Sequence, residues 1–432
     1  KPLLMQPPIK NKTVLAVDPA YRTGCKLAVV DGNSRVLFTG VIYPTPPQSK
    51  IEESEKRVLE LIDKYKIDCI SIGNGTASKE SEIFIADTIK KSSHPVSYMV
   101  VNEAGASVYS ASKLGAEEFP DFDVSVRSAV SIARRLQDPL SELVKIEPKS
   151  IGVGQYQHDV PPARLEESLS GVVEDCVNSV GVDLNTASVS LLKYIAGVSA
   201  STAKNIVAYR EENGAFTSRT ELKKVKGLGP KAFQQCAGFL RIPKGKTALD
   251  NTGVHPESYD AAKKLLDIFG YSQKDVAEQG ASGIGGKVKD YGIAKAAEEC
   301  GVGTPTLTDI IAELEKPGRD IRDELPKPML RTDIMDMNDL KEGMELTGTV
   351  RNVIDFGVFV DIGVHQDGLV HISQICDRYI KHPSEVLKVG EVVYRYEVVD
   401  TRELRICAIS REANNGNIVV VARNIITYRP FI

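Results

Sequence analysis

The spacing of apolar residues changes twice along this chain of 432 residues, so a single fold class cannot accommodate the whole sequence. Apolar strands alternate with amphipathic helices over residues 12–145, which is typical of an α/β domain. Residues 183–242 repeat a helical pattern with an offset of 30, and short alternating strands follow over residues 340–411. The sequence therefore predicts three parts in succession: an α/β domain, an all-α module and a small β-barrel.

Three carboxylates stand out in the α/β part. Asp18 ends the first expected strand, Glu103 follows a strand at 97–101, and Asp138 lies late in a helix expected over residues 125–145. Acids that converge in this way can hold two divalent ions, Mg²⁺ or Mn²⁺, which neutralise the attacking and leaving oxygens in phosphodiester hydrolysis. The alternative is that Asp18 and Asp138 are turn and cap residues before prolines, and that Glu103 is a solvated loop acid.

The repeat at 183–242 has the pattern of two helix-hairpin-helix units. Apolar residues and one glycine recur at matching positions: Leu192, Ile195, Gly197, Ala203 and Ile206 correspond to Leu222, Val225, Gly227, Phe233 and Cys236. Glycines in such hairpins, here Gly197, Gly227 and Gly229, let backbone amides approach a phosphate closely.

The charge of this repeat supports a phosphate-binding role. It contains nine basic and four acidic residues in a chain whose net charge is −4. Lys224, Lys226 and Lys231 surround the second hairpin and are our candidate phosphate contacts. The alternative is a helical packing unit with an incidental basic face.

Five short strands over about 70 residues predict a Greek-key barrel of the OB type at 338–412. We expect Phe356, Phe359 and His371 to offer stacking platforms for unpaired bases, with Arg405 and Arg411 as phosphate partners. Since alternate strand residues point inward, we expect one of the two phenylalanines to belong to the core. Nine basic against thirteen acidic residues indicate that binding here depends more on stacking than on charge.

Several long motifs resemble the bacterial Tex family of transcription accessory proteins. They read AVDP at 16–19 with RTGCK at 22–26, IGNGTAS at 72–78, VNEAGASVYS at 101–110, RRLQDP at 134–139 and IGVGQYQHD at 151–159. VIDFGVFV at 353–360 and GLVHIS at 368–373 resemble the S1 RNA-binding domain. The resemblance extends over nearly all of residues 1–412, although Ala20 stands where the family usually has glycine.

The resemblance implies that residues 12–145 form a YqgF-type domain with an RNase H-like fold. Asp18, Glu103 and Asp138 would then match the acidic positions of related resolvase nucleases. In Tex proteins this domain is generally regarded as a binding or scaffolding unit. The family also has helical segments ahead of the point where this sequence begins.

The remaining segments carry less information. Residues 146–182 read as a helical linker, 243–337 as a small helical region without chemistry, and 413–432 as a tail to which we assign no role. Seven irregularly spaced cysteines favour a reducing compartment, the cytoplasm. The absence of a long apolar run excludes a membrane-spanning helix, and the first residues suggest a chain that lacks its natural start.

Three hypotheses follow from the sequence. The first is a nucleic-acid-binding transcription accessory protein that holds RNA, or duplex or single-stranded DNA, and requires no cofactor. The second is a metal-dependent, structure-selective nuclease of the RNase H-like class. The third is a scaffold that contacts RNA polymerase or the ribosome.

Overall fold

The computed structural model describes residues 1–151, 157–325, 327–328, 330–332, 345–362, 367–376, 378–388, 392–400, 405–408, 410–412 and 418–420. From residue 392 onward the description is confined to the backbone.

The α/β part is built on a five-stranded mixed sheet with the order β3-β2-β1-β4-β5. The strands β1, β2 and β3 form an antiparallel meander, whereas β4 and β5 continue from β1 in parallel. Their bounds are Val14–Asp18 (β1), Cys25–Val30 (β2), Val36–Ile42 (β3), Cys69–Gly73 (β4) and Ser97–Val101 (β5).

Both faces of the sheet are covered by helices, so the central strands are apolar on both sides. One face packs against α1 (Ile51–Tyr65) and α2 (Ser78–Ile89), and the other packs against α5 (Val124–Gln137). Side chains of β1 point alternately to the two faces of the sheet. Leu15 and Val17 therefore belong to the core with α1 and α2, and Val14 and Ala16 to the core with α5. Short helices α3 (Ala106–Ala111), α4 (Lys113–Glu118) and α6 (Pro139–Leu143) complete the domain.

The helix expected over residues 125–145 is interrupted. Asp138 ends α5 in an extended conformation and caps α6, because the side chain of Asp138 accepts the backbone N–H of Ser141. Pro139 occupies the first position of α6, where its missing N–H costs nothing.

A long helix, α7 (Pro162–Val180), leads from the α/β domain into the hairpin module. The module contains α8 (Val189–Leu192), α9 (Ala200–Asn213), the 3-10 helix η3 (Arg219–Lys224) and α10 (Pro230–Cys236). Two short parallel strands, β6 (Val182–Asp183) and β7 (Leu240–Arg241), join its two ends.

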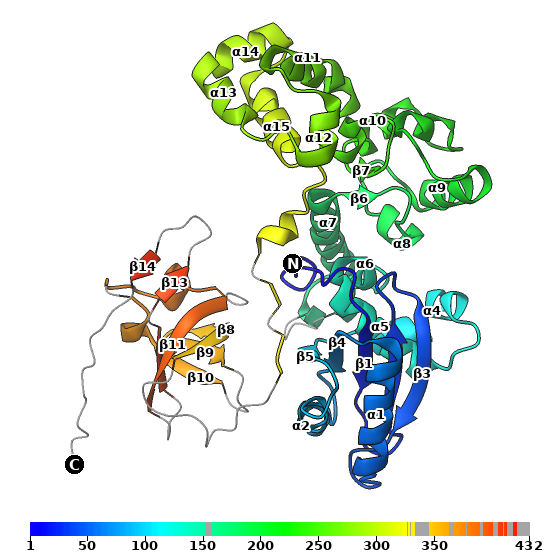
Figure 1. Cartoon of the computed structure of the whole chain (residues 1–432), viewed down its shortest axis with the longest axis vertical. Coiled ribbons are helices and arrows are strands. Elements are labelled where there is room, and N and C mark those ends of the chain that lie inside the picture. The colour runs from blue at the N-terminus through cyan, green and yellow to red at the C-terminus, as the bar shows by residue number, and fades with distance from the viewer. Residues whose placement is uncertain are drawn as a thin grey trace.

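The next region is also helical and has a core of its own. It contains α11 (Tyr259–Phe269), α12 (Gln273–Gln279), α13 (Ile284–Tyr291), α14 (Ile293–Cys300) and α15 (Thr304–Glu315), followed by the 3-10 helix η6 (Ile321–Glu324). In Figure 1 these helices lie at the end of the molecule farthest from the sheet.

The C-terminal part is a closed barrel with the strand order β10-β12-β11-β8-β9. Its strands are β8 (Glu345–Ile354), β9 (Gly357–Asp361), β10 (Gly368–His371), β11 (Val392–Asp400) and β12 (Arg405–Ala408). A separate antiparallel pair, β13 (Ser410–Glu412) and β14 (Ile418–Val420), follows. The predicted combination of α/β, all-α and barrel parts is thus confirmed.

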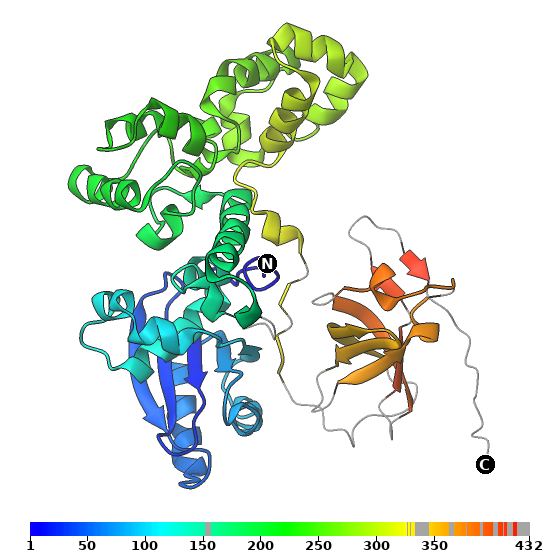
Figure 2. The same ribbon diagram turned by 180° about the vertical axis from the view of Figure 1, so that it is seen from behind.

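Two arginines, the buried Arg322 and the partly buried Arg331, join these parts to the α/β domain. Arg322 of η6 donates to Asp138 at 2.7 Å, and Arg331 forms an antiparallel backbone bridge with Tyr98 of β5. Arg331 also pairs with Glu82 at 3.2 Å and with Asp361 of the barrel at 2.9 Å. Figures 1 and 2 show the barrel beside the sheet on the far side of this connecting segment.

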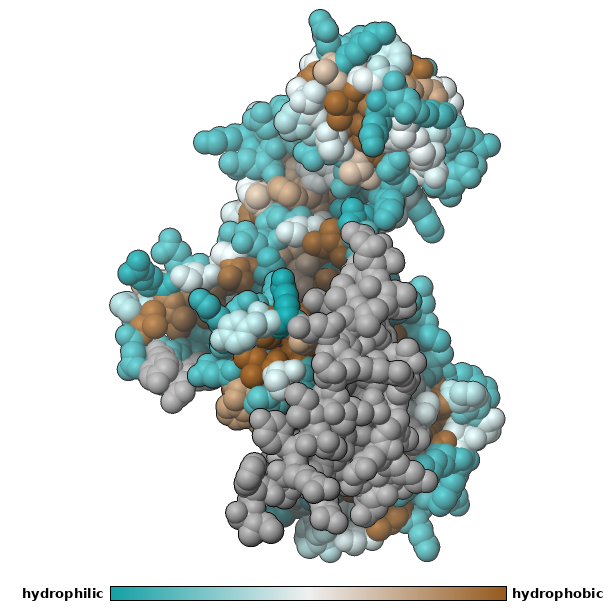
Figure 3. Space-filling model, turned by 90° about the vertical axis from the view of Figure 1, so that its left-hand side faces the viewer, coloured by the Kyte–Doolittle hydropathy of each residue, from teal (hydrophilic) through white to brown (hydrophobic). Residues whose placement is uncertain are grey.

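On the face drawn in Figure 3, the described surface is mainly hydrophilic. The hydrophobic residues outside the grey area of this face (Figure 3) form small separate patches among hydrophilic ones. Among the described residues, no helix is both long enough and apolar enough to cross a membrane.

Candidate functional site

The first candidate site lies at the carboxyl ends of β1 and β5, where Asp18 and Glu103 approach each other. Gly73 and Gly75 line the pocket of the Glu103 carboxylate, and a Cβ at either position would collide with it. The backbone N–H of Gly75 donates to this carboxylate, and Asn74 Oδ1 accepts the backbone N–H of Glu103 at 3.0 Å. The glycines of this strand-to-helix turn therefore make room for an acid.

Burial changes the acidity of both groups. Loss of solvent raises the pKa of Asp18 to about 6, with a further rise from the neighbouring Glu103 charge, while a hydrogen bond from Ser128 opposes the shift. Burial also raises the pKa of Glu103. Among the described residues, no hydrogen-bond donor reaches Glu103 Oε2.

Asp138 does not join these two acids, so the predicted three-acid cluster is wrong. Ser128, near the start of α5, bonds Asp18 at the end of β1, whereas Gln137, at the end of α5, donates to the carbonyl of Lys12 ahead of β1. The helix therefore runs antiparallel to the strand. The ten residues from Ser128 to Asp138 correspond to about 15 Å of helix.

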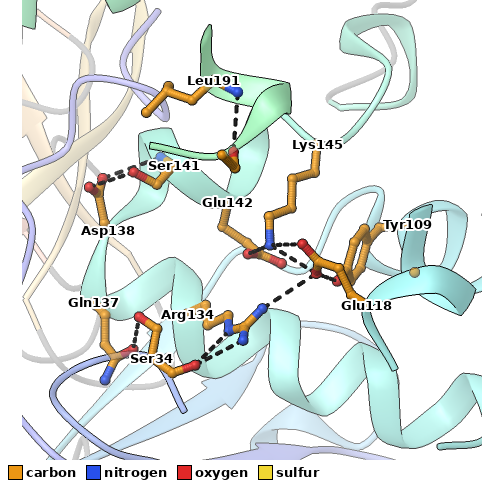
Figure 4. A network of polar contacts seen from close by, with 12 residues as sticks. Ser34, Tyr109, Glu118, Arg134, Gln137, Asp138, Ser141, Glu142, Lys145 and Leu191 are labelled. Carbon is orange, nitrogen blue, oxygen red and sulfur yellow. Dashed lines mark hydrogen bonds and ion pairs between the residues drawn. The ribbon is translucent and has the colours of Figure 1, made fainter. Parts of the chain in front are cut away.

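Asp138 instead contributes to a junction between domains. Its carboxylate accepts from the hydroxyl of Ser141 at 2.7 Å, as Figure 4 shows, and from Arg322 at 2.7 Å. Nearby, Lys145 pairs with the buried Glu142 at 2.9 Å and with Glu118 at 3.0 Å (Figure 4). The alternative reading of Asp138 as a cap residue fits these contacts.

The positions that could complete a metal site near Asp18 hold other side chains. Ser128 of α5 faces Asp18, and the buried guanidinium of Arg135 lies close enough to Glu103 to lower its pKa. Within the described part of the chain, no group of three or more His, Cys, Asp or Glu side chains could hold a metal ion. These residues do not fit a site for two divalent ions, which needs several converging carboxylates.

The raised pKa of Asp18 predicts a pH-dependent stability. The folded domain favours the protonated carboxyl of Asp18. The contribution of this carboxyl to the free energy of unfolding is therefore fully present below about pH 4 and is lost as pH rises through about 6. We expect Asp18→Asn to stabilise the protein by about 1 to 2 kcal/mol at pH 7.5, allowing for partial exposure, and to have little effect at pH 4. Urea unfolding at both pH values measures this difference.

The exposed Asp87 provides the control, since Asp87→Asn should change stability by little at either pH. An equal effect of Asp18→Asn at both pH values would contradict the assignment. If Mn²⁺ raised the melting temperature of the parent chain but not that of Asp18→Asn, the residues around Asp18 would bind the ion, contrary to our conclusion.

The second candidate site is the hairpin module. Gly197 and Gly227 have φ values of 78° and 83°, in the left-handed region that favours glycine. Each is followed by a buried apolar residue and an extended N-cap, Ser199 or Gly229. The two hairpins differ in access: a Cβ on Gly197 would meet Gln235 at 2.7 Å, whereas Gly229 faces open space. The second hairpin is thus the more accessible one.

A third hairpin of this shape, overlooked in the sequence analysis, connects α14 to α15. Gly301 has a φ of 71°, and Gly303 is an extended N-cap with φ −72° and ψ 156°, close to the −75° and 173° of Gly229. The Gly-x-Gly pattern at 301–303 was the signal that could have revealed it. Its nearest charged neighbours along the chain are the acids Glu298 and Glu299, and Lys264 of α11 lies close to Cys300 beside it.

The basic residues of the hairpin module divide by type. All six lysines are exposed, including Lys224, Lys226 and Lys231 near the second hairpin. The three arginines are at least partly buried and donate to backbone carbonyls: Arg210 to Leu184, Arg219 to Leu240 and Arg241 to Arg319. The lysines therefore provide the surface charge, while the arginines hold the module together.

The third candidate site is the outer face of the barrel. Phe356 lies in the turn after β8 and is 53% exposed, and His371 at the end of β10 is exposed as well. Phe359 is partly exposed between Val358 and Val360, which are fully buried. The expectation that one phenylalanine belongs to the core is wrong, because Phe356 is outside the strand alternation and Phe359 points outward.

The two arginines expected beside this face have different positions. The register places Arg405 of β12 opposite Leu369 of β10. Arg411 lies in β13, which is not one of the five barrel strands, and pairs with Val419. The side chains of both lie outside the described residues, so their contacts with phosphate stay a prediction.

Family models match four successive parts of the chain. A Tex protein YqgF-like domain matches residues 12–137, a helix-hairpin-helix motif matches 177–241, and an S1 RNA-binding domain matches 339–402. A further HHH domain matches 247–322, a region to which the sequence analysis assigned no chemistry.

The fold and these domains define a class of multidomain protein in which RNase H-like, helix-hairpin-helix and S1 modules share one chain. Among curated relatives, YdcI of Bacillus subtilis is 55% identical over 90% of this chain and 54% of its own length. The protein tex of Bordetella pertussis and the transcriptional accessory protein Tex of Neisseria gonorrhoeae are each 50% identical over 91% of this chain, covering 49% and 51% of their own lengths. The chain belongs to the Tex family, and it spans about half the length of these relatives.

Proposed function

We propose that this chain is the nucleic-acid-binding part of a transcription accessory protein. Single-stranded RNA would bind to the outer face of the S1 barrel, and the second hairpin would contact phosphates of RNA or DNA. The observation that carries the proposal is a group of rings on one side of the barrel, of which Phe356 and His371 are exposed and Phe359 is partly exposed. Rings left in contact with water beside a packed core are suited to stacking on unpaired bases.

The hairpin module supports a second, sequence-independent contact. The backbone at Gly227 and Gly229 is open to solvent, and exposed lysines lie on both sides of it. Backbone amides and lysines of this kind contact phosphates, which carry no base information. We therefore propose that this module positions nucleic acid and that the barrel selects unpaired bases.

The nuclease alternative is less well supported than the binding function. Asp18 and Glu103 lie together, but Ser128 and Arg135 stand beside them where further acids would be needed. We propose that the RNase H-like domain acts as a scaffold. We propose RNA polymerase or the ribosome as the kind of partner for it. The name of the Neisseria relative refers to transcription.

The salt dependence of binding tests the role of the hairpin module. Replacing Lys224 and Lys226 by glutamate should flatten the slope of log affinity against log salt for duplex DNA by about 2, since each lost phosphate contact removes about one released counterion. Fluorescence anisotropy at several salt concentrations measures the slope.

Replacement by glutamate of two exposed lysines in α1 of the RNase H-like domain, Lys56 and Lys64, provides the matched control. An unaltered slope in Lys224→Glu/Lys226→Glu would favour the packing alternative for the module. The same titrations with single-stranded RNA and single-stranded DNA determine which polymer the whole chain prefers.

A further inference from the structure

Tyr379 is the most exposed large hydrophobic side chain among the described residues. Its exposed fraction is 89%, compared with 54% for Ile51 and 53% for Phe356. The ring belongs to the segment that joins β10 to β11 and was not among the residues expected to bind nucleic acid. An aromatic ring carries a large apolar surface, so leaving it in water calls for an explanation.

The segment that carries Tyr379 is held in place by the residues that follow the ring. Ile380 is buried in the barrel core at 5% exposure. Glu385 accepts the backbone N–H groups of Lys381 and His382 at 3.0 and 3.1 Å. The ring therefore projects from an anchored backbone, and little conformational entropy would be lost when a ligand stacks on it.

Tyr379 lies at the same end of the barrel as the predicted stacking rings. His382, three residues further on, approaches Asp355 at 3.3 Å, and Asp355 immediately precedes Phe356. The carbonyl of Phe356 in turn accepts the backbone N–H of Ile372, next to His371. These contacts bring the segment of Tyr379 against the turn between β8 and β9.

The charges around Tyr379 suit a polyanion. Arg378 and Lys381 flank the ring and are exposed. Asp377 precedes Arg378 in the sequence, so residues 377–381 carry two cations and one acid. The next acid, Glu385, directs its carboxylate to the backbone amides of Lys381 and His382. This local pattern contrasts with the acidic excess of residues 338–412 as a whole.

We infer that Tyr379 is an additional stacking platform for single-stranded RNA, with Arg378 and Lys381 as its phosphate contacts. The strand would continue from Phe359 and His371 across the β8–β9 turn, past Phe356, to Tyr379. This inference rests on the proposed function of the barrel. A single ring between two cations fits a base and its phosphates, whereas a protein interface would need a contiguous apolar patch.

The absence of tryptophan from the chain makes a direct test possible. Tyr379→Trp introduces a single fluorophore at the proposed platform. Its emission should be quenched on saturation with an oligouridylate of about twelve nucleotides, which is within the span of one OB fold. Phe356→Trp is the matched positive control on the main face, and Tyr21→Trp in the RNase H-like domain is the negative control.

Affinity gives a second readout that does not depend on fluorescence. Tyr379→Ala should weaken binding of the oligouridylate about 5- to 150-fold, while Tyr379→Phe should retain it, because stacking needs the ring and not the hydroxyl. Circular dichroism of each variant checks that the barrel is folded.

The outcomes separate the inference from the function on which it rests. Quenching in Phe356→Trp but not in Tyr379→Trp, with unchanged affinity of Tyr379→Ala, would overturn the inference and leave the proposed function intact. Failure of the parent chain to bind the oligouridylate would overturn both. Quenching in all three tryptophan variants, Tyr21→Trp included, would indicate nonspecific association and would also overturn the inference.

Discussion

Replacing Arg219 by methionine should lower the free energy of unfolding by about 3 to 5 kcal/mol, the cost of breaking a buried charged network. Arg219 has no exposed surface and donates from Nε to the carbonyl of Leu240 at 2.6 Å. Its Nη1 donates to the carbonyl of Val254 and the hydroxyl of Tyr259, each at 2.8 Å, and Tyr259 donates to Asp250. Methionine would fill much of the volume but leave these acceptors without a donor.

Thermal and urea unfolding of the full chain measure the loss, and Lys204→Met, an exposed site on α9, is the control for charge and side-chain type. A melting temperature of Arg219→Met equal to that of Lys204→Met would contradict the role of Arg219. Because η3 begins at Arg219 and leads into the second hairpin, we also expect the variant to weaken duplex binding.

Arg219 also shows why charge counts in a sequence overestimate a binding surface. The sequence places nine basic residues in the hairpin module, which supports a phosphate-binding role. In the structure, three of them, all arginines, donate hydrogen bonds to backbone carbonyls instead of facing solvent as the lysines do. Their acceptors lie far along the chain, 35 residues away for Arg219 and Val254, and a local pattern does not contain that pairing.

Local patterns did predict the elements themselves. Apolar runs between helical segments define the strands of the sheet, and alternating apolar residues define those of the barrel. The offset repeat defines the hairpins. All these features depend on residues close in sequence. Burial then follows from alternation where a strand is regular, as in β9, where Val358 and Val360 are core residues. The exposure of Phe356 follows from its position in a turn, to which strand alternation does not apply.

The assignment of Asp138 failed for a different reason. The sequence places it in a helix of the right domain, and a helix was the expected carrier of a third acid. The role of Asp138 depends on the direction of α5 relative to β1. It also depends on its partner Arg322, which lies 184 residues away in the sequence. Both depend on tertiary structure, so an acid at the correct helix can still lie at the opposite end of the sheet from Asp18.

Loss of both phenylalanine rings from the barrel face should have the largest effect on RNA binding. Each stacked base contributes about 1 to 3 kcal/mol, so Phe356→Leu/Phe359→Leu should weaken binding of single-stranded RNA at least about thirtyfold. Leucine keeps an apolar side chain at each position and removes only the aromatic face, so the barrel core of Val358 and Val360 is left intact. Anisotropy titrations with the full chain measure the affinity, and Tyr21→Leu, an exposed ring in the RNase H-like domain, is the control.

Since the barrel is acidic overall, this loss of affinity in the double variant should persist at high salt, whereas the contribution of Lys224 and Lys226 to binding should fade. Unchanged affinity of the folded double variant would show that RNA does not stack on this face, and the proposed function of the barrel would have to be abandoned.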